Sequence, residues 1–215
     1  RDLHSFPTRR SSDLQSYFDG DDQSDFSQAK ELAKWADVVI LCMGEKGSWS
    51  GENNSHAKIE LPEIQQQLIE IVHKAGGKIV LALASGRPVI LGSAVQASDA
   101  ILEIWHPGIL GGEALAGILS GRYNPSGKLA MTFPYSQGQI PIYYNRRNSA
   151  RRHQGFYKDM TSEPLYPFGY GLSYTHFTYG VPVADKLTVS KDDHFSITIP
   201  VTNDGGMNGK EAVLW

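Results

Sequence analysis

Two carboxylates lie in a polar loop that follows a short apolar run. Residues 38–43 are continuously apolar, and residues 44–58 are polar and rich in Ser, Gly and Asn. This loop contains Glu45 and Glu52. A carboxyl group that is protonated near the working pH can act as a general acid toward a leaving oxygen. Most glutamates in polar loops are simply solvated. The spacing alone therefore makes Glu45 and Glu52 only candidates for a general acid.

The apolar run before the loop is typical of a strand buried on both faces of a sheet. Comparable runs occupy residues 78–84 and 100–105, and apolar residues recur at helical spacing over 26–36, 61–72 and 113–119. This alternation predicts an α/β fold, a mostly parallel sheet flanked by helices on both faces. In such sheets ligands bind beyond the carboxyl ends of the strands, which is where the loop after residue 43 begins.

The pattern changes after residue 135. Residues 135–180 are dense in Tyr, Pro and Gly, which predicts an irregular packed extension. Residues 187–189 and 194–201 alternate apolar and polar side chains, and 211–215 begins another apolar stretch, so we expect antiparallel strands there. Because a two-sheet sandwich needs roughly 100 residues, 181–215 is predicted to be a truncated all-β sandwich fragment.

Composition and charge exclude several classes of protein. The formal net charge of -3 argues against a nucleic-acid partner, and the apolar runs are too short for a membrane span. The single cysteine, Cys42, excludes an internal disulfide, and on an apolar strand it is expected to be a small core residue. No spacing of His, Cys or acidic residues is typical of a metal site, and Gly108–Gly112 lacks the residues of a nucleotide cradle, so we expect neither metal nor cofactor.

The first residues form a separate case. Residues 1–14, RDLHSFPTRRSSDL, show neither helical nor strand periodicity, and they resemble the translated product of a sequencing adapter. We therefore interpret residues 1–14 as a non-native segment without fixed structure. A basic N-terminal arm is the alternative.

A series of short motifs runs in order along the rest of the chain, from about Ser24 to Trp215. It resembles the C-terminal half of glycoside hydrolase family three, near its periplasmic β-glucosidases. The motifs are Gly44-Glu45, Ser50-Gly51-Glu52, Leu61-Pro62, Ser85-Gly86-Arg87-Pro88, Trp105-His106-Pro107-Gly108, Gly111-Gly112, Tyr123-Asn124-Pro125-Ser126-Gly127-Lys128-Leu129, Gln139-Ile140-Pro141 and the stretch Tyr166 to Tyr174.

The resemblance implies three successive domains: a barrel, an α/β sandwich (residues 15–180 here) and a fibronectin-type-III-like domain (181–215). It also implies a retaining exo-acting hydrolase of β-linked oligosaccharides or aryl glucosides, in the periplasm or secreted. The family's nucleophile is an Asp of the barrel and its acid/base is a loop Glu, matched here by Glu52. The chain is then expected to be a fragment, marginally stable and inactive without the barrel, since retaining hydrolysis needs two carboxyls.

Other readings of these motifs stay open at this point. β-Xylosidase activity is the alternative within the family, and a non-catalytic module that binds carbohydrate or a partner domain is the alternative outside it. Trp49 could stack on a sugar ring, although packing on its own domain is favoured. Glu45 is the rival acid, but a structural hydrogen bond is the favoured role. Arg87 is expected in a buried pair, and His56 departs from the Arg usual in the family.

Overall fold

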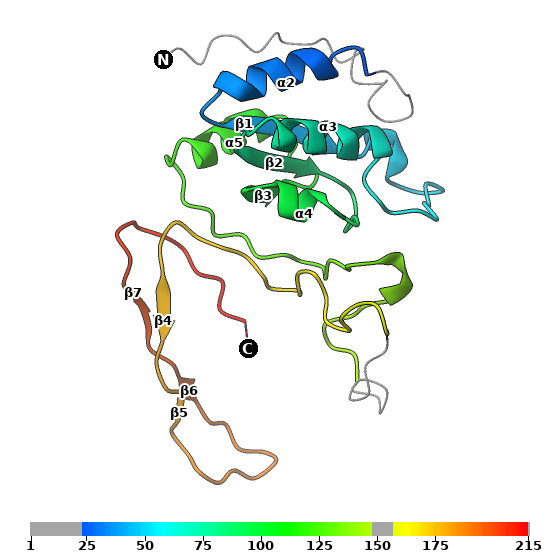
Figure 1. The fold of residues 1–215 in the computed structure, drawn as a ribbon. Coiled ribbons are helices and arrows are strands. Elements are labelled where there is room, and N and C mark those ends of the chain that lie inside the picture. The colour runs from blue at the N-terminus through cyan, green and yellow to red at the C-terminus, as the bar shows by residue number, and fades with distance from the viewer. Residues whose placement is uncertain (1–22, 148–156, 215) are drawn as a thin grey trace. The chain divides into compact units, whose positions relative to one another are not determined.

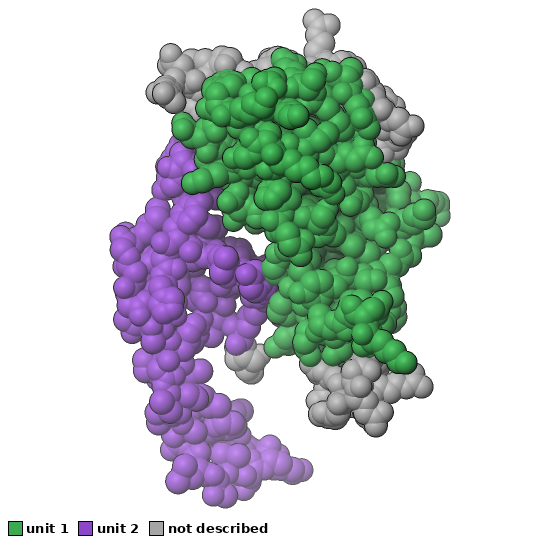
Figure 2. All heavy atoms as spheres, in the orientation of Figure 1, with its two compact units in different colours: residues 1–112, 131–167 green, residues 113–130, 168–215 purple. Residues whose placement is uncertain are grey.

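A computed structural model of the chain describes residues 23–147 and 157–214. These residues form two compact units, coloured separately in Figure 2. The first unit runs to Gly112 and adds Met131–Pro167, and the second contains Glu113–Ala130 and the chain from Phe168 onward. The segment 1–14 lies outside the described residues. The expected boundary at residue 180 between an α/β domain and a fibronectin-type-III-like domain stays a prediction.

The first unit is built on a parallel sheet of three strands in the order β1–β2–β3 (Figure 1). The strands are β1 (Val39–Gly44), β2 (Ile79–Ala84) and β3 (Ala100–Glu103). The central strand β2 is the most buried of the three: Ile79, Leu81, Ala82 and Leu83 are fully buried. The sheet confirms the predicted α/β class with parallel strands.

Helices connect these strands, as parallel pairing requires. Helix α2 (Phe26–Trp35) precedes β1, α3 (Glu63–Lys74) connects β1 to β2, and α4 (Ala94–Ala97) connects β2 to β3. Helix α3 contacts both α2 and α4, and α5 (Gly111–Leu119) follows β3. The sequence did not indicate α4, because a helix of four residues is too short to show a helical period.

Strand β1 corrects one expectation. It was predicted to be buried on both faces, but only Val39 and Gly44 are buried, while Ile40 is 37% exposed and Cys42 is also exposed. The expectation that Cys42 is a core residue is therefore wrong. In the described part of the chain, strand β1 lies at the edge of the sheet, with β2 on one side only. A continuous apolar run does not distinguish such an edge strand from a central one.

The sequence pattern did not indicate that a glutamine of α3, Gln65, is buried against the end of β1. The residues buried on α3 are Ile64, Gln65, Ile69 and Val72, so one polar side chain lies among the apolar ones. The Gln65 side chain is 1% exposed, and its amide accepts a hydrogen bond from the Gly44 N–H and donates one to the Gly44 carbonyl, both at 2.9 Å. The amide of Gln65 thus pairs with β1 as a neighbouring strand would, at the point where the loop begins.

Gln65→Leu is expected to lower the free energy of unfolding by about 2–4 kcal/mol, because both Gly44 groups lose their buried partner. The change keeps the apolar volume of the site, so the lost hydrogen bonds account for the effect. The matched control is Gln67→Leu, whose side chain hydrogen-bonds only to exposed groups and which should cost less than about 1 kcal/mol. Urea unfolding measures both, and equal costs would contradict the role assigned to Gln65.

The described parts of the segment 131–167 in the first unit, residues 131–147 and 157–167, are irregular, as predicted. They contain one short 3₁₀ helix, η2 (Gln137–Gln139), and an isolated bridge between Phe133 and Tyr166. Phe133 is buried, with its ring 6.0 Å from that of Trp105. The buried Gln139 side chain accepts from the Tyr135 N–H and donates to the carbonyls of Thr161 and Glu163, which joins distant parts of this segment.

The second unit joins two of the sequence motifs. The Asn124 side chain accepts from the Ser173 hydroxyl and the Tyr174 N–H, both at 2.8 Å, and donates to the carbonyl of Asn208. Leu129 exchanges backbone hydrogen bonds with the 169–170 segment. These contacts bring the motif at 123–129 against the later part of the motif at 166–174.

The C-terminal part of the second unit forms small antiparallel sheets, which confirms the predicted change to β-structure. Strand β4 (Phe177–Tyr179) pairs with β7 (Val201–Asn203), and β5 (Val183–Ala184) pairs with β6 (Ile197–Thr198). The predicted strands at 187–189 and 211–215 are wrong as far as the structure describes them, since 187–189 and 211–214 are not in strands. Period-two alternation also occurs in extended chain that has no pairing partner.

Candidate functional site

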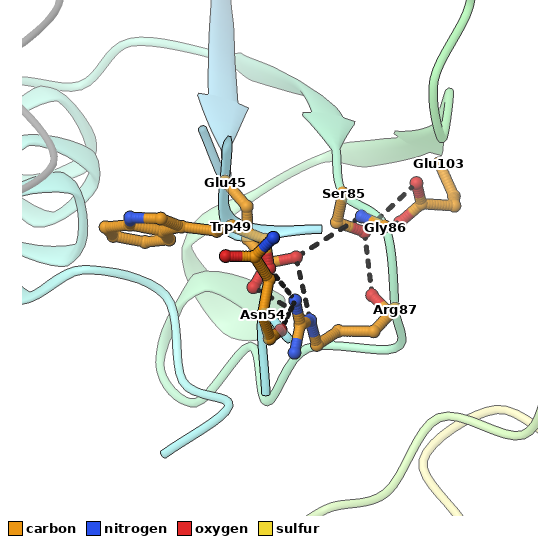
Figure 3. A network of polar contacts seen from close by, with 7 residues as sticks. All are labelled: Glu45, Trp49, Asn54, Ser85, Gly86, Arg87 and Glu103. Atoms are coloured by element: carbon orange, nitrogen blue, oxygen red, sulfur yellow. Dashed lines mark hydrogen bonds and ion pairs between the residues drawn. The ribbon is translucent and has the colours of Figure 1, made fainter. Parts of the chain in front are cut away.

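The carboxyl ends of the three strands bring polar residues together (Figure 3). Gly44 pairs with Ala84 and Leu83 pairs with Glu103, so the strands end at one edge of the sheet. Glu45 follows β1, Ser85 follows β2, and Glu103 is the last residue of β3. This is the edge at which the sequence predicted a site.

Glu45 and Arg87 form an ion pair at this edge. The Glu45 side chain is 5% exposed, and its carboxylate lies 3.1 Å from Nε of Arg87 and accepts a hydrogen bond from the Gly86 N–H. The expected pair of Arg87 is confirmed, and Glu45 makes a structural hydrogen bond, the role favoured for it. The Glu45 carboxylate is thus engaged by a guanidinium and a backbone N–H of the segment that follows β2.

Arg87 also binds the main chain of the loop. Its terminal Nη2 donates hydrogen bonds to the carbonyls of Trp49 and Asn54 (Figure 3). These two residues lie on either side of Glu52 in the sequence. The single side chain of Arg87 therefore contacts the loop at its start, before Glu52 and after it.

Glu52 itself lies in the exposed turn of the loop. Gly51 and Asn53 on either side have φ angles of 115° and 63°, in the left-handed region that Gly and Asn tolerate best. The Asn54 side chain donates to the Glu52 carbonyl at 3.1 Å. Within the described residues the Glu52 carboxylate has neither a hydrogen bond nor an ion pair, so it is not joined to the Glu45–Arg87 pair. Its catalytic role stays a prediction.

Trp49 packs against residues of its own loop. It ends the 3₁₀ helix η1 (Gly47–Trp49) and is half-buried. Its ring lies 4.9 Å from the His56 ring, and the Lys46 ammonium lies 5.5 Å from its centroid. His56 is thus a packing partner of Trp49 rather than a solvated side chain. Stacking of Trp49 on a sugar stays a prediction.

Glu103 belongs to the same cluster and was missed. One of its oxygens accepts from the Trp105 N–H at 2.7 Å, and the other lies 3.3 Å from the Ser85 hydroxyl, which itself donates to the Arg87 carbonyl at 2.8 Å. Burial raises the pKa of Glu103 to about 7, and repulsion by Glu45 adds to this, although the hydrogen bonds oppose it. A neutral Glu103 could donate a hydrogen bond to the Ser85 hydroxyl. Each polar group in the series from Trp105 through Glu103 and Ser85 to the Arg87 carbonyl would then have a partner. Only the position of Glu103 at a strand end could have indicated it from the sequence.

Glu103→Gln is expected to make the protein relatively more stable at high pH. The folded carboxyl binds its proton up to about pH 7 while the unfolded one loses it near its ordinary value of 4.5, so wild-type stability falls as pH rises through this window. Between pH 5 and 8 the variant should gain about 2–3 kcal/mol relative to wild type, measured by urea unfolding. Glu31→Gln is the control, because hydrogen bonding to Lys34 lowers the pKa of Glu31 below this window. A pH-independent difference for Glu103→Gln would contradict the raised pKa.

Residues 23–147 and 157–214 contain no group of three His, Cys, Asp or Glu side chains that could hold a metal ion. None of the helices among these residues has the length and apolar character needed to cross a bilayer.

The fold and the site together define an α/β domain with a glutamate-bearing loop at the carboxyl edge of its sheet. The family model described as "Glycosyl hydrolase family 3 C-terminal domain" matches residues 6–174. The chain therefore belongs to glycosyl hydrolase family 3, as its motifs indicated.

Similar proteins include enzymes with two specificities. The chain is 40% identical over 199 residues to the periplasmic beta-glucosidase of Salmonella typhimurium, covering 89% of this chain and 26% of that protein. It is 36% identical to a beta-xylosidase of Formosa agariphila, covering 87% of this chain and 26% of that protein. A solved structure of beta-glucosidase from Listeria innocua in complex with isofagomine matches with a TM-score of 0.76 and 37% identity, over 85% of this chain and 26% of that one. The chain spans about a quarter of the length of these relatives.

Proposed function

We propose that the chain is the acid/base-bearing part of a retaining, exo-acting β-glucosidase-like hydrolase. The observation that carries the proposal is the state of the carboxylates at the sheet edge. Glu45 is tied to Arg87 and Glu103 to the Ser85 and Trp105 groups, whereas Glu52 is exposed and has a carboxylate without a partner among the described residues. Of the three, Glu52 is the one whose carboxylate is not engaged by neighbouring described groups, so we assign the acid/base role to it.

Glu52 would protonate the leaving oxygen in the first step and accept a proton from water in the second. Retention requires a second carboxyl about 5–5.5 Å away, which attacks the anomeric carbon. We assign that nucleophile to a barrel domain that this chain would pack against, following the family resemblance. The substrate is then a β-linked oligosaccharide or an aryl glucoside, and the compartment is the periplasm or the exterior, as for the Salmonella typhimurium relative.

β-Xylosidase activity is the second candidate, because the Formosa agariphila relative bears that name at 36% identity. A glucoside and a xyloside differ by one hydroxymethyl group. The described loop does not contain a contact that selects between them, so specificity is to be decided by rates on both sugars.

A chimera tests the proposal. In this chimera the chain replaces the matching segment of the Salmonella typhimurium periplasmic beta-glucosidase. The rest of the chimera is the remainder of that protein. We expect hydrolysis of 4-nitrophenyl β-glucoside with retention of configuration, seen by NMR of the first product. Faster cleavage of the xyloside would favour the second candidate. A folded chimera that binds glucose but cleaves neither sugar would favour a non-catalytic module and contradict the proposal.

A further inference from the structure

Arg87 is bound to three separate points of the loop that carries Glu52. We propose that Arg87 is a positioning residue, which holds the loop main chain so that the Glu52 carboxyl has a fixed place relative to a bound glycoside. The inference rests on the proposed function of Glu52, but the contacts of Arg87 do not depend on it.

The contacts of the guanidinium lie on both sides of Glu52. Its Nε lies 3.1 Å from the Glu45 carboxylate at the start of the loop. Its Nη2 donates to the carbonyl of Trp49, three residues before Glu52, and to that of Asn54, two residues after it, at 3.4 Å to the latter. The turn that presents Glu52 is therefore held at both of its ends by one planar group.

Arg87 is itself rigidly placed. It follows the central strand β2 by three residues, and the Ser85 hydroxyl donates to its carbonyl at 2.8 Å. The side chains of Arg87 and Glu45 are 21% and 5% exposed, so their ion pair is screened by water far less than a surface pair. Through Arg87, the loop is thus attached to the end of the central strand of the sheet.

The backbone next to Arg87 independently places the loop against the end of β2. A Cβ atom on Gly86 would lie 2.0 Å from the Ser50 hydroxyl oxygen and 2.8 Å from Ser50 Cβ. Residue 86 must therefore lack a side chain for the loop to lie where it does. The backbone hydrogen bonds within the loop are by contrast local, each spanning three residues, such as that from the Asn54 N–H to the Gly51 carbonyl at 3.2 Å.

Lysine cannot replace arginine in this role. A lysine at position 87 would keep the charge beside Glu45, but its ammonium is a compact point charge without the planar fork that spans separated acceptors. The turn would then lose at least one anchor. A displacement of about 1 Å at a reacting group can cost about 10²-fold in rate, so a loosened Glu52 should act as a weakened acid and base.

Hydrogen exchange on the 215-residue chain tests the anchoring without any need for activity. In Arg87→Lys, the amides of residues 49–54 should exchange at least about tenfold faster, while those of β2 stay unchanged. Arg122→Lys is the matched control, since Arg122 is exposed and its guanidinium lies over the Tyr123 ring in the other unit. Unchanged exchange of residues 49–54 in Arg87→Lys would overturn the proposal.

Kinetics of the active chimera test the consequence for Glu52. Arg87→Lys should lower kcat/KM, which reports the first step, about 10–10²-fold on alkyl β-glycosides and much less on dinitrophenyl β-glycosides. On the dinitrophenyl substrates the base-assisted second step becomes limiting, so kcat and KM should fall together. Added azide should restore part of the lost turnover. Faster exchange together with an equal loss on all leaving groups would overturn the positioning role. If Glu52→Ala also lacks a leaving-group dependence, it is the assignment of the acid/base that fails, whereas the exchange result stands.

Discussion

Glu52→Ala in the chimera is expected to reduce cleavage of alkyl β-glycosides by about 10²–10⁴-fold. An alkoxide leaves slowly unless it is protonated as the bond breaks, and the variant has lost the carboxyl proposed to supply that proton. Dinitrophenyl glycosides need little protonation, so their first step should suffer far less. Rates across a series of leaving groups of graded pKa measure the difference, as a steeper dependence in the variant than in the parent.

The second step of Glu52→Ala should still lack its base. The glycosyl-enzyme intermediate should then accumulate on activated substrates, and azide should restore turnover, because it attacks without base assistance. Glu45→Gln is the comparison, since the Glu45 carboxylate contacts Arg87 and the Gly86 N–H and the amide oxygen can accept the same bonds. It should lose far less activity than Glu52→Ala. An equal loss of Glu52→Ala on all leaving groups, without azide rescue, would show that Glu52 is structural.

Gly44→Ala is expected to destabilise the first unit by more than about 4 kcal/mol. Gly44 has a φ of 136°, and a Cβ there would lie 1.8 Å from the carbonyl oxygen of Ala84 on the paired strand. Neither backbone can move without breaking the β1–β2 pairing or the hydrogen bonds from Gln65 to Gly44. Urea unfolding followed by circular dichroism gives the change in free energy.

Gly47→Ala is the matched control for Gly44→Ala. Gly47 lies three residues further on, and a Cβ there meets no atom within 4 Å. Its effect should be within about 0.5 kcal/mol. If both substitutions cost the same, the close approach of β1 and β2 at Gly44 is not what limits that position.

The sequence predicted the elements that long apolar patterns mark. The strands at 78–84 and 100–105, the helix at 61–72 and the polar loop after residue 43 are all found within a few residues. The loop that begins with Glu45 was likewise predicted at the carboxyl edge, where parallel strands end, and Arg87 was expected in a buried pair but not at this edge. Local patterns contain this information because buried apolar residues recur along the sequence with the period of the helix or strand they belong to.

The remaining features depend on contacts between distant residues. Gln65 breaks the apolar pattern of α3 because its amide satisfies the backbone of Gly44, 21 positions away. Glu103 reads as one polar residue in an apolar run, and its burial beside Ser85 depends on the register of β2 and β3. The sequence of β1 does not show that one of its faces is exposed, since the same apolar residue types occur in edge strands and in the core.

That exposed face has a practical use. Cys42 is the single cysteine of the sequence, and it is exposed on β1, three residues before Glu45. A maleimide dye or a nitroxide will therefore attach at one known place in the chain, without any cysteine having to be removed first. The emission of the dye or the line shape of the nitroxide reports on the environment of the sheet beside the loop. The sequence as it stands is thus ready for fluorescence titration or spin-label measurements when a candidate partner domain is added.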